Sequence, residues 1–249
     1  MRVTRRWLAI GASIALFCGY GTAQETVGRE AVTINSIIQA LEKSQAGIRP
    51  QVSYQVIREY RLSGASNSST NSDVVAEVHF RPPGREEYSI QKSSGSARGQ
   101  QVVQRVLDHE VEEKASGNQA RSALSRDNYD FNSIGQEVLD GQLCYVLGLT
   151  PRRKEKDLIS GKVWVDQRSF LVRQIEGELA KTPSWWLRKV HVKLTFADLK
   201  GTWLQTNMEA VADVRLVGLQ TLTSRVLDYQ GAAEVASTGT SLRSPNRKP

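Results

Sequence analysis

Alternating apolar and polar residues dominate the second half of the chain. In KVHVKLTF, residues 189–196, every even position is apolar, and the odd positions are Lys, His, Lys and Thr. Successive side chains of a β-strand point to opposite faces of a sheet, so this pattern predicts a strand with one buried and one solvated face. The same alternation recurs in residues 73–80 and 202–217. Much of the chain is therefore predicted to form a half-buried antiparallel sheet.

Two other segments repeat their apolar residues at helical spacing. TINSIIQALEKSQAG, residues 33–47, carries an apolar stripe, with Thr33 or Asn35 as the N-cap and Gly47 as the end. The stripe consists of Ile34, Ile37, Ile38 and Leu41. A second helix is predicted within RGQQVVQRVLDHEVEEK, residues 98–114, where Val and Leu recur four positions apart.

Turn residues divide the remaining apolar segments into hairpins. Asp140-Gly141 predicts one tight turn, and a second turn is expected near Gln167-Arg168. The count is eight to eleven strands and two helices. This predicts an α+β fold, a strongly curved antiparallel β-sheet (a half-barrel) with two or more helices packed in its concave face. A closed up-and-down barrel is the alternative.

The ends of the chain indicate export and one domain. Residues 1–23 have a basic start, a short apolar run and a small-residue cleavage site near Ala23, as in a signal peptide. Residues 32–230 are predicted to form a single domain and residues 231–249 a disordered tail. No transmembrane segment is expected in the mature chain. A nucleic-acid partner is not expected, although 33 basic residues outnumber 26 acidic ones, because an exported protein does not ordinarily meet nucleic acid.

Extending the register of residues 189–196 backwards assigns two adjacent tryptophans to opposite faces. Trp186 falls on the apolar face and Trp185 on the charged face with Leu187, provided that no β-bulge intervenes. Arg188 falls on the apolar face, where a charge is costly unless it is paired or meets a polar ligand group. The small inward residues of 202–217 leave room that a carrier would use for a ligand. The residues predicted to line a hydrophobic ligand cavity are Trp186, Arg188, Val190, Val192, Leu194, Phe196, Leu204 and Met208.

Motifs of catalysis are absent from the sequence. It has no nucleophile elbow, no phosphate-binding glycine loop and no cysteine cluster. Its histidines, His79, His109 and His191, fall on three separate predicted elements. His109 and Glu113 are interpreted as a charged surface pair, because the second histidine of a zinc-binding helix is missing. We predict no enzymatic activity, no cofactor and no metal. The charge run TPRRKEKD, residues 150–157, is interpreted as a solvated loop, with contacts to anionic lipid head groups or an acidic partner as the alternative.

The order of these elements resembles the outer-membrane lipoprotein-sorting (LolA/LolB-like) family. The segments FRPPGREEY, RDNYDF, ISGKVWVDQRSFLVRQIEGE and TPSWWLRKVHVKLTFADLKGTWLQT are similar to an exported branch of that family. The resemblance covers residues 32–230 and implies a helix-closed half-barrel in the periplasm. It also implies an apolar cavity for acyl chains and an inner-strand arginine that holds the closing helix, for which Arg188 is a candidate. Cys18 is not in a lipobox, so the lipid-anchored receptor type is the poorer match.

These observations predict a periplasmic binding or carrier protein that holds lipid or lipoprotein acyl chains. Inner- or outer-membrane transfer partners are candidates for handing the ligand over. The alternative is a protein-interaction or stress-sensor module on the same fold, with Trp185, Leu187 and the PRRKEKD loop as its contact surface.

Overall fold

A computed structural model describes residues 33–48, 52–64, 71–116 and 119–231. The predicted signal peptide lies outside the described residues, as does the predicted tail apart from Gly231. The helices are α1 (Ile34–Gly47), α2 (Ala97–Ala115) and α3 (Gln119–Ser122). The strands are β1 (Tyr54–Gly64), β2 (Ser72–Arg81), β3 (Arg85–Gly95), β4 (Tyr129–Leu139), β5 (Gln142–Pro151), β6 (Ile159–Asp166), β7 (Val172–Leu179), β8 (Leu187–Leu199), β9 (Thr202–Val214) and β10 (Gly218–Gly231).

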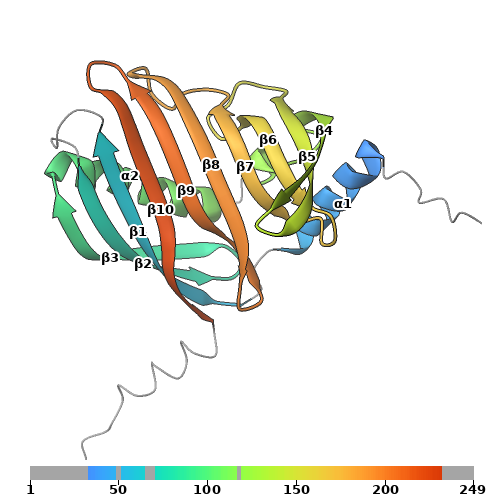
Figure 1. Cartoon of the computed structure of the whole chain (residues 1–249). Coiled ribbons are helices and arrows are strands. Elements are labelled where there is room, and N and C mark those ends of the chain that lie inside the picture. Colours follow the sequence, from blue (N-terminus) through green and yellow to red (C-terminus); the bar gives the residue numbers. More distant parts are fainter. Residues whose placement is uncertain (1–32, 49–51, 65–70, 117–118, 232–249) are drawn as a thin grey trace, which may run out of the picture. The chain divides into compact units, whose positions relative to one another are not determined.

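All ten strands form one antiparallel sheet. Its order is β3-β2-β1-β10-β9-β8-β7-β6-β5-β4, so β1 pairs with β10 and the two ends of the domain meet in the middle of the sheet. β3 and β4 are the edges of this sheet and do not pair with each other, which leaves it open (Figure 1). The predicted α+β half-barrel is confirmed, and the closed barrel is wrong. No helix within the described ranges is long and apolar enough to cross a membrane.

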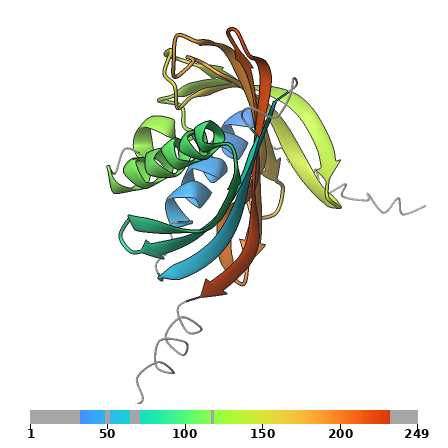
Figure 2. The same ribbon diagram turned by 90° about the vertical axis from the view of Figure 1, so that its left-hand side faces the viewer.

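Both long helices cover the same face of the sheet (Figure 2). The side chains of α1 pack into a core with β5, β6 and β7, and those of α2 pack into a second core with β1 and β2. Shared neighbours join these cores to a cluster in the middle of the sheet: Ile175 contacts the first core, and Ala210 contacts the second. The apolar face is therefore continuous across the sheet, and the helices divide it between them.

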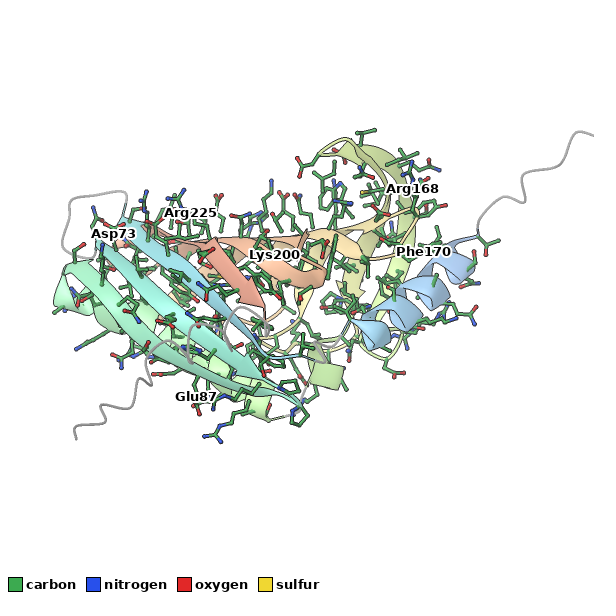
Figure 3. The ribbon with its side chains drawn as sticks, turned by 90° about the horizontal axis from the view of Figure 1, so that it is seen from below. Asp73, Glu87, Arg168, Phe170, Lys200 and Arg225 are labelled. Atoms are coloured by element: carbon green, nitrogen blue, oxygen red, sulfur yellow. The ribbon has the colours of Figure 1, made fainter. Side chains whose placement is uncertain are left out.

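The predicted α1 forms for the reasons read from its sequence. Thr33 is the N-cap, and its hydroxyl accepts a hydrogen bond from the backbone nitrogen of Ser36 at 3.2 Å. The buried residues of its stripe are Ile37, Ile38 and Leu41. Burying each such side chain contributes about 1.5–3 kcal/mol. The last turn is fixed to the β6–β7 turn, because the Ser44 hydroxyl donates to the carbonyl of Phe170 at 2.7 Å; Figure 3 shows Phe170 beside the helix.

The two predicted hairpin turns are confirmed. Asp140 and Gly141 have φ angles of 49° and 75°, the left-handed conformation that a two-residue hairpin requires. In the β6–β7 turn, the Asp166 carboxylate accepts hydrogen bonds from the backbone nitrogens of Arg168 and Ser169, each at 2.9 Å. Burial alone would raise the pKa of Asp166, but these bonds and the Arg173 guanidinium lower it to about 2.

Candidate functional site

Six of the eight residues predicted to line a cavity pack in apolar clusters along the sheet. Val190, Val192 and Leu194 pack together in the middle of the sheet, in a cluster made of strand residues. The other three lie in different clusters. Phe196 packs against the α1 core, Met208 against the α2 core, and Leu204 against a cluster that contains Tyr54 and Phe80. The six residues therefore do not converge on one point.

The predicted positions of Trp186 and Arg188 are wrong, and the reason is a β-bulge. Leu187 pairs with Val214 and Lys189 pairs with Asp213, so Arg188 is an extra residue in the strand. Leu187 consequently joins the apolar cluster, whereas the Arg188 side chain is exposed and lies 3.7 Å from the Asp213 carboxylate.

The tryptophans precede this bulge and lie outside the strand. Trp186 is 41% exposed, so the prediction that it lies inside is wrong. Trp185 is 79% exposed, as predicted. Strand β8 begins only at Leu187. The two rings contact each other edge to face, with centroids 6.5 Å apart.

Arg58, on β1, is an arginine that faces inward. Its guanidinium donates to the backbone carbonyl of Gln205 at 2.8 Å and to the Ser224 hydroxyl at 3.4 Å. Sequence reasoning missed it, although alternation was visible: Arg58 stands between Val56 and Tyr60, which are both buried on the helix-bearing face. An inward arginine is therefore supplied by β1 and not by the predicted position on β8.

Polar contacts fix the C-terminal half of α2 to the sheet. Tyr88 of β3 donates to the Asp108 carboxylate at 2.6 Å, and Tyr60 of β1 donates to Glu110 at 3.0 Å. Near the end of the helix, Lys114 forms an ion pair with Glu86, whose side chain is only 3% exposed. By contrast, the helix has 19 residues and fully buries only Gly99, Val103 and Leu107.

The ionisable groups beneath α2 are shifted by their surroundings. Burial raises the pKa of Glu110 above its ordinary value, against the lowering effects of Arg58 and the Tyr60 hydrogen bond. Burial would lower the pKa of Lys114, but the charges of Tyr54 and Glu86 and the hydrogen bond to Glu86 raise it overall. Burial also raises the pKa of Tyr60. Glu110 is therefore a carboxylate that is costly to ionise while α2 is docked.

A polar cleft of about 650 Å³ opens between α2 and the loops that follow β5 and β7. It is lined by Glu113, Arg121, Ser122, Lys154, Glu155, Lys156, Asp157, Lys181, Thr182 and Pro183. Much of the predicted charge run therefore borders a cleft. At its edge, the Nε2 atom of His109 lies 3.6 Å from the Asp157 carboxylate.

His109, Glu113 and Asp157 offer donor atoms that all lie within 4.8 Å of one another. Lys154 and Lys156 line the same cleft, and their charge opposes a cation there. His79 and His191 lie elsewhere, 2.9 Å from Glu77 and 3.6 Å from Glu176 respectively. The three histidines thus remain on separate elements.

No family model and no curated protein matches this sequence. Among solved structures, the chain is similar to a LolA superfamily protein from Nitrosomonas europaea, with 16% identity, a TM-score of 0.36 and coverage of 80% of this chain and 94% of the other. It is also similar to a DUF1329 family protein from Desulfovibrio piger (13% identity, TM-score 0.40, 80% and 92% covered). A third similar structure is the MucA/MucB complex of Pseudomonas aeruginosa. The identity is 13%, the TM-score is 0.27, and the match covers 78% of this chain and 97% of the other.

The resemblance to LolA-like proteins predicted from the sequence is thus found again among solved structures. The strand order and the shared face of the two helices define the fold class.

Proposed function

We propose that this protein is a periplasmic binding or carrier protein that holds the acyl chains of lipids or lipoproteins against the helix-bearing face of its sheet. The observation that carries the proposal is the unequal attachment of α2. The helix covers an apolar face, yet charged and hydroxyl groups supply many of its contacts. Such contacts are re-formed with water when a helix moves away, whereas apolar packing is lost outright.

In this function α2 is a movable cover. Its displacement would expose the α2 core, which Ala210 joins to the middle cluster, and the small side chains of Ala210 and Ala212 leave space above β9. An acyl chain would replace the apolar contacts of Val103 and Leu107, and Arg58 would remain as a cation at the inner face for a carbonyl or phosphate oxygen. No covalent step is involved.

Filling this space tests the proposal. Ala210→Trp is expected to reduce the binding of a fluorescent fatty acid by tenfold or more, because the indole would occupy the volume beneath the cover. Glu209→Trp is the matched control, since the neighbouring side chain is exposed and points to the other face of β9. Unfolding midpoints of both variants check that they fold, and Ala212→Trp replaces Ala210→Trp if that variant does not. Equal probe binding by the parent and a folded Ala210→Trp variant would overturn the proposal, as would purified parent protein without lipid or probe affinity.

The exposed tryptophans favour a second candidate function, a protein-interaction or stress-sensor module on the same fold. Leu187 drops out of its predicted contact surface because it packs in the middle cluster. Trp185 remains, and the basic loop after β5 lies beside the cleft. A pull-down from periplasmic extract with the parent and with Trp185→Ala tests this function: a specific partner that the variant loses would support it.

A further inference from the structure

Two loops at one end of the sheet display large apolar side chains to solvent. One is the connection between β7 and β8, and the other is the turn between β9 and β10. Antiparallel order places the start of β8 and the end of β9 at the same end, the upper end in Figure 1. The exposed fractions are 79% for Trp185, 41% for Trp186, 105% for Leu216, 41% for Val217 and 53% for Leu219. We call these five residues the tip.

The two loops are joined by direct contact. The backbone nitrogen of Arg215 donates to the carbonyl of Trp186 at 2.8 Å, so the indoles and the turn residues form one surface. Leu216 has a φ of 76°, a left-handed conformation that costs about 1–2 kcal/mol for a residue with a side chain. Asn or Gly would suit that position better. Nothing within the fold uses the leucine, because its side chain is fully exposed.

Basic residues surround the tip. Residues 181–189 and 213–219 contain Lys181, Arg188, Lys189 and Arg215, against one acid, Asp213. Arg188 is paired with Asp213 and Lys189 with Glu178. Within the described part of the chain, Lys181 and Arg215 form no ion pair. The tip therefore combines two tryptophans and three aliphatic side chains with a net positive rim.

This combination matches the surface of an anionic bilayer. Tryptophan favours the membrane–water interface, where its ring meets hydrocarbon and its N–H meets polar head groups. Each basic residue near an anionic leaflet contributes about 1 kcal/mol to binding. We propose that the tip docks the protein on membranes containing anionic phospholipid, with the indoles and Leu216 inserted among the head groups.

Docking at this end would bring the cover helix to the bilayer. The loop that carries the tryptophans also contributes Lys181, Thr182 and Pro183 to the polar cleft, whose other wall includes Glu113 of α2. The same loop thus connects the membrane contact with the last turns of the cover helix. This relation rests on the proposed carrier function, but the docking itself does not.

Vesicle binding tests the proposal directly. The parent is expected to co-sediment with vesicles of phosphatidylcholine and phosphatidylglycerol, and to bind neutral phosphatidylcholine vesicles at least tenfold more weakly. Brominated lipid should quench its tryptophan fluorescence. Trp185→Ser/Trp186→Ser should weaken binding at least tenfold, and Lys181→Gln/Arg215→Gln roughly thirtyfold on the anionic vesicles. Leu227→Ser is the control, because Leu227 is 47% exposed but borders a shallow pocket beside the β8–β9 turn at the other end.

Three results would overturn docking. The first is equal binding of the parent to neutral and anionic vesicles, and the second is equal vesicle binding by the tryptophan variant and the parent. The third is capture of a periplasmic protein through Trp185 without vesicle binding, which would assign the tip to a protein contact. Failure of the carrier function is distinguishable, because it appears as lost acyl-probe affinity while vesicle binding persists.

Discussion

At the scale of single side chains, Glu110 of α2 lies among charged neighbours where the helix meets the sheet. It is half-buried, accepts a hydrogen bond from Tyr60 at 3.0 Å, and shares its surroundings with Arg58, Glu86 and Lys114. Its pKa is raised chiefly by burial, which means that the docked helix favours the protonated carboxyl. We therefore expect the attachment of α2 to depend on pH through Glu110.

The pH dependence has a definite sign. A carboxyl whose pKa is raised in the folded state binds its proton more tightly when folded, so ionisation above that pKa opposes folding. Between the ordinary value of 4.5 and the raised folded value, a fall in pH should increase the contribution of Glu110 to the free energy of unfolding. Glu110→Gln should be more stable than the parent at neutral pH. Its free energy of unfolding should also lack the pH-dependent contribution of Glu110. Urea denaturation from pH 4.5 to 8 measures both effects, and an unchanged pH profile in the variant would contradict the assignment.

Residue-scale prediction from sequence failed where one backbone irregularity intervened. Alternation placed Val190, Val192 and Leu194 on the correct face, because strand periodicity holds between bulges. It misplaced Trp186 and Arg188, because the bulge at Arg188 shifts the register and the strand begins only at Leu187. The alternation of residues 189–196 gives no indication of the bulge at Arg188, which immediately precedes them. Arg58 follows the same alternation on β1, and its place between the buried residues Val56 and Tyr60 is the signal that could have identified it.

At the scale of elements, α1 and α2 differ in how they are held. The stripe of α1 is buried in a core of strand side chains, and its end is fixed to Phe170 and Leu124 through Ser44 and Gln45. α2 depends more on Tyr60, Tyr88 and Glu86. Both helices were predicted from their apolar spacing, and α1 also from its N-cap. The unequal attachment of the two helices could not be predicted, because the hydrogen-bond and ion-pair partners of α2 lie 20 to 50 residues away in the chain.

Removing the ion pair at the end of α2 should loosen that helix selectively. Lys114→Met leaves Glu86, whose side chain is 3% exposed, without its cation, at a cost of about 1–3 kcal/mol. Hydrogen exchange should rise across Ala97–Ala115 more than across Ile34–Gly47. Lys92→Met, at an exposed position on β3, is the control and should leave both helices unchanged. An equal rise in the two helices would mean that the pair stabilises the whole domain rather than the cover.

At the scale of the whole molecule, the proposed functions would fall to three different parts of one sheet. The middle strands carry the apolar face, β1 to β3 hold the cover helix, and the β7–β8 and β9–β10 loops form the tip. Strand number, the hairpin turn at Asp140-Gly141 and the open sheet with helices on one face were predicted from the sequence. The pairing of β1 with β10 was not, because contacts between the two ends of a domain leave no mark in local periodicity.

This separation predicts that the tip affects the rate at which an acyl ligand is transferred from a membrane, but not the affinity with which the ligand is bound. The tip lies outside the apolar clusters, so Trp185→Ser/Trp186→Ser should bind a free acyl probe with the affinity of the parent. Transfer of the same probe from phosphatidylglycerol-containing vesicles should slow about tenfold or more, because docking brings the cover helix to the donor bilayer and two inserted tryptophans contribute over 1.4 kcal/mol to that encounter.

Lys114→Met should instead accelerate release of the probe to neutral and anionic acceptor vesicles alike, since this substitution acts on the cover helix. Stopped-flow transfer measured with both variants separates these effects: a tip variant with unchanged transfer rate would show that loading proceeds through free ligand in solution, without a docked intermediate.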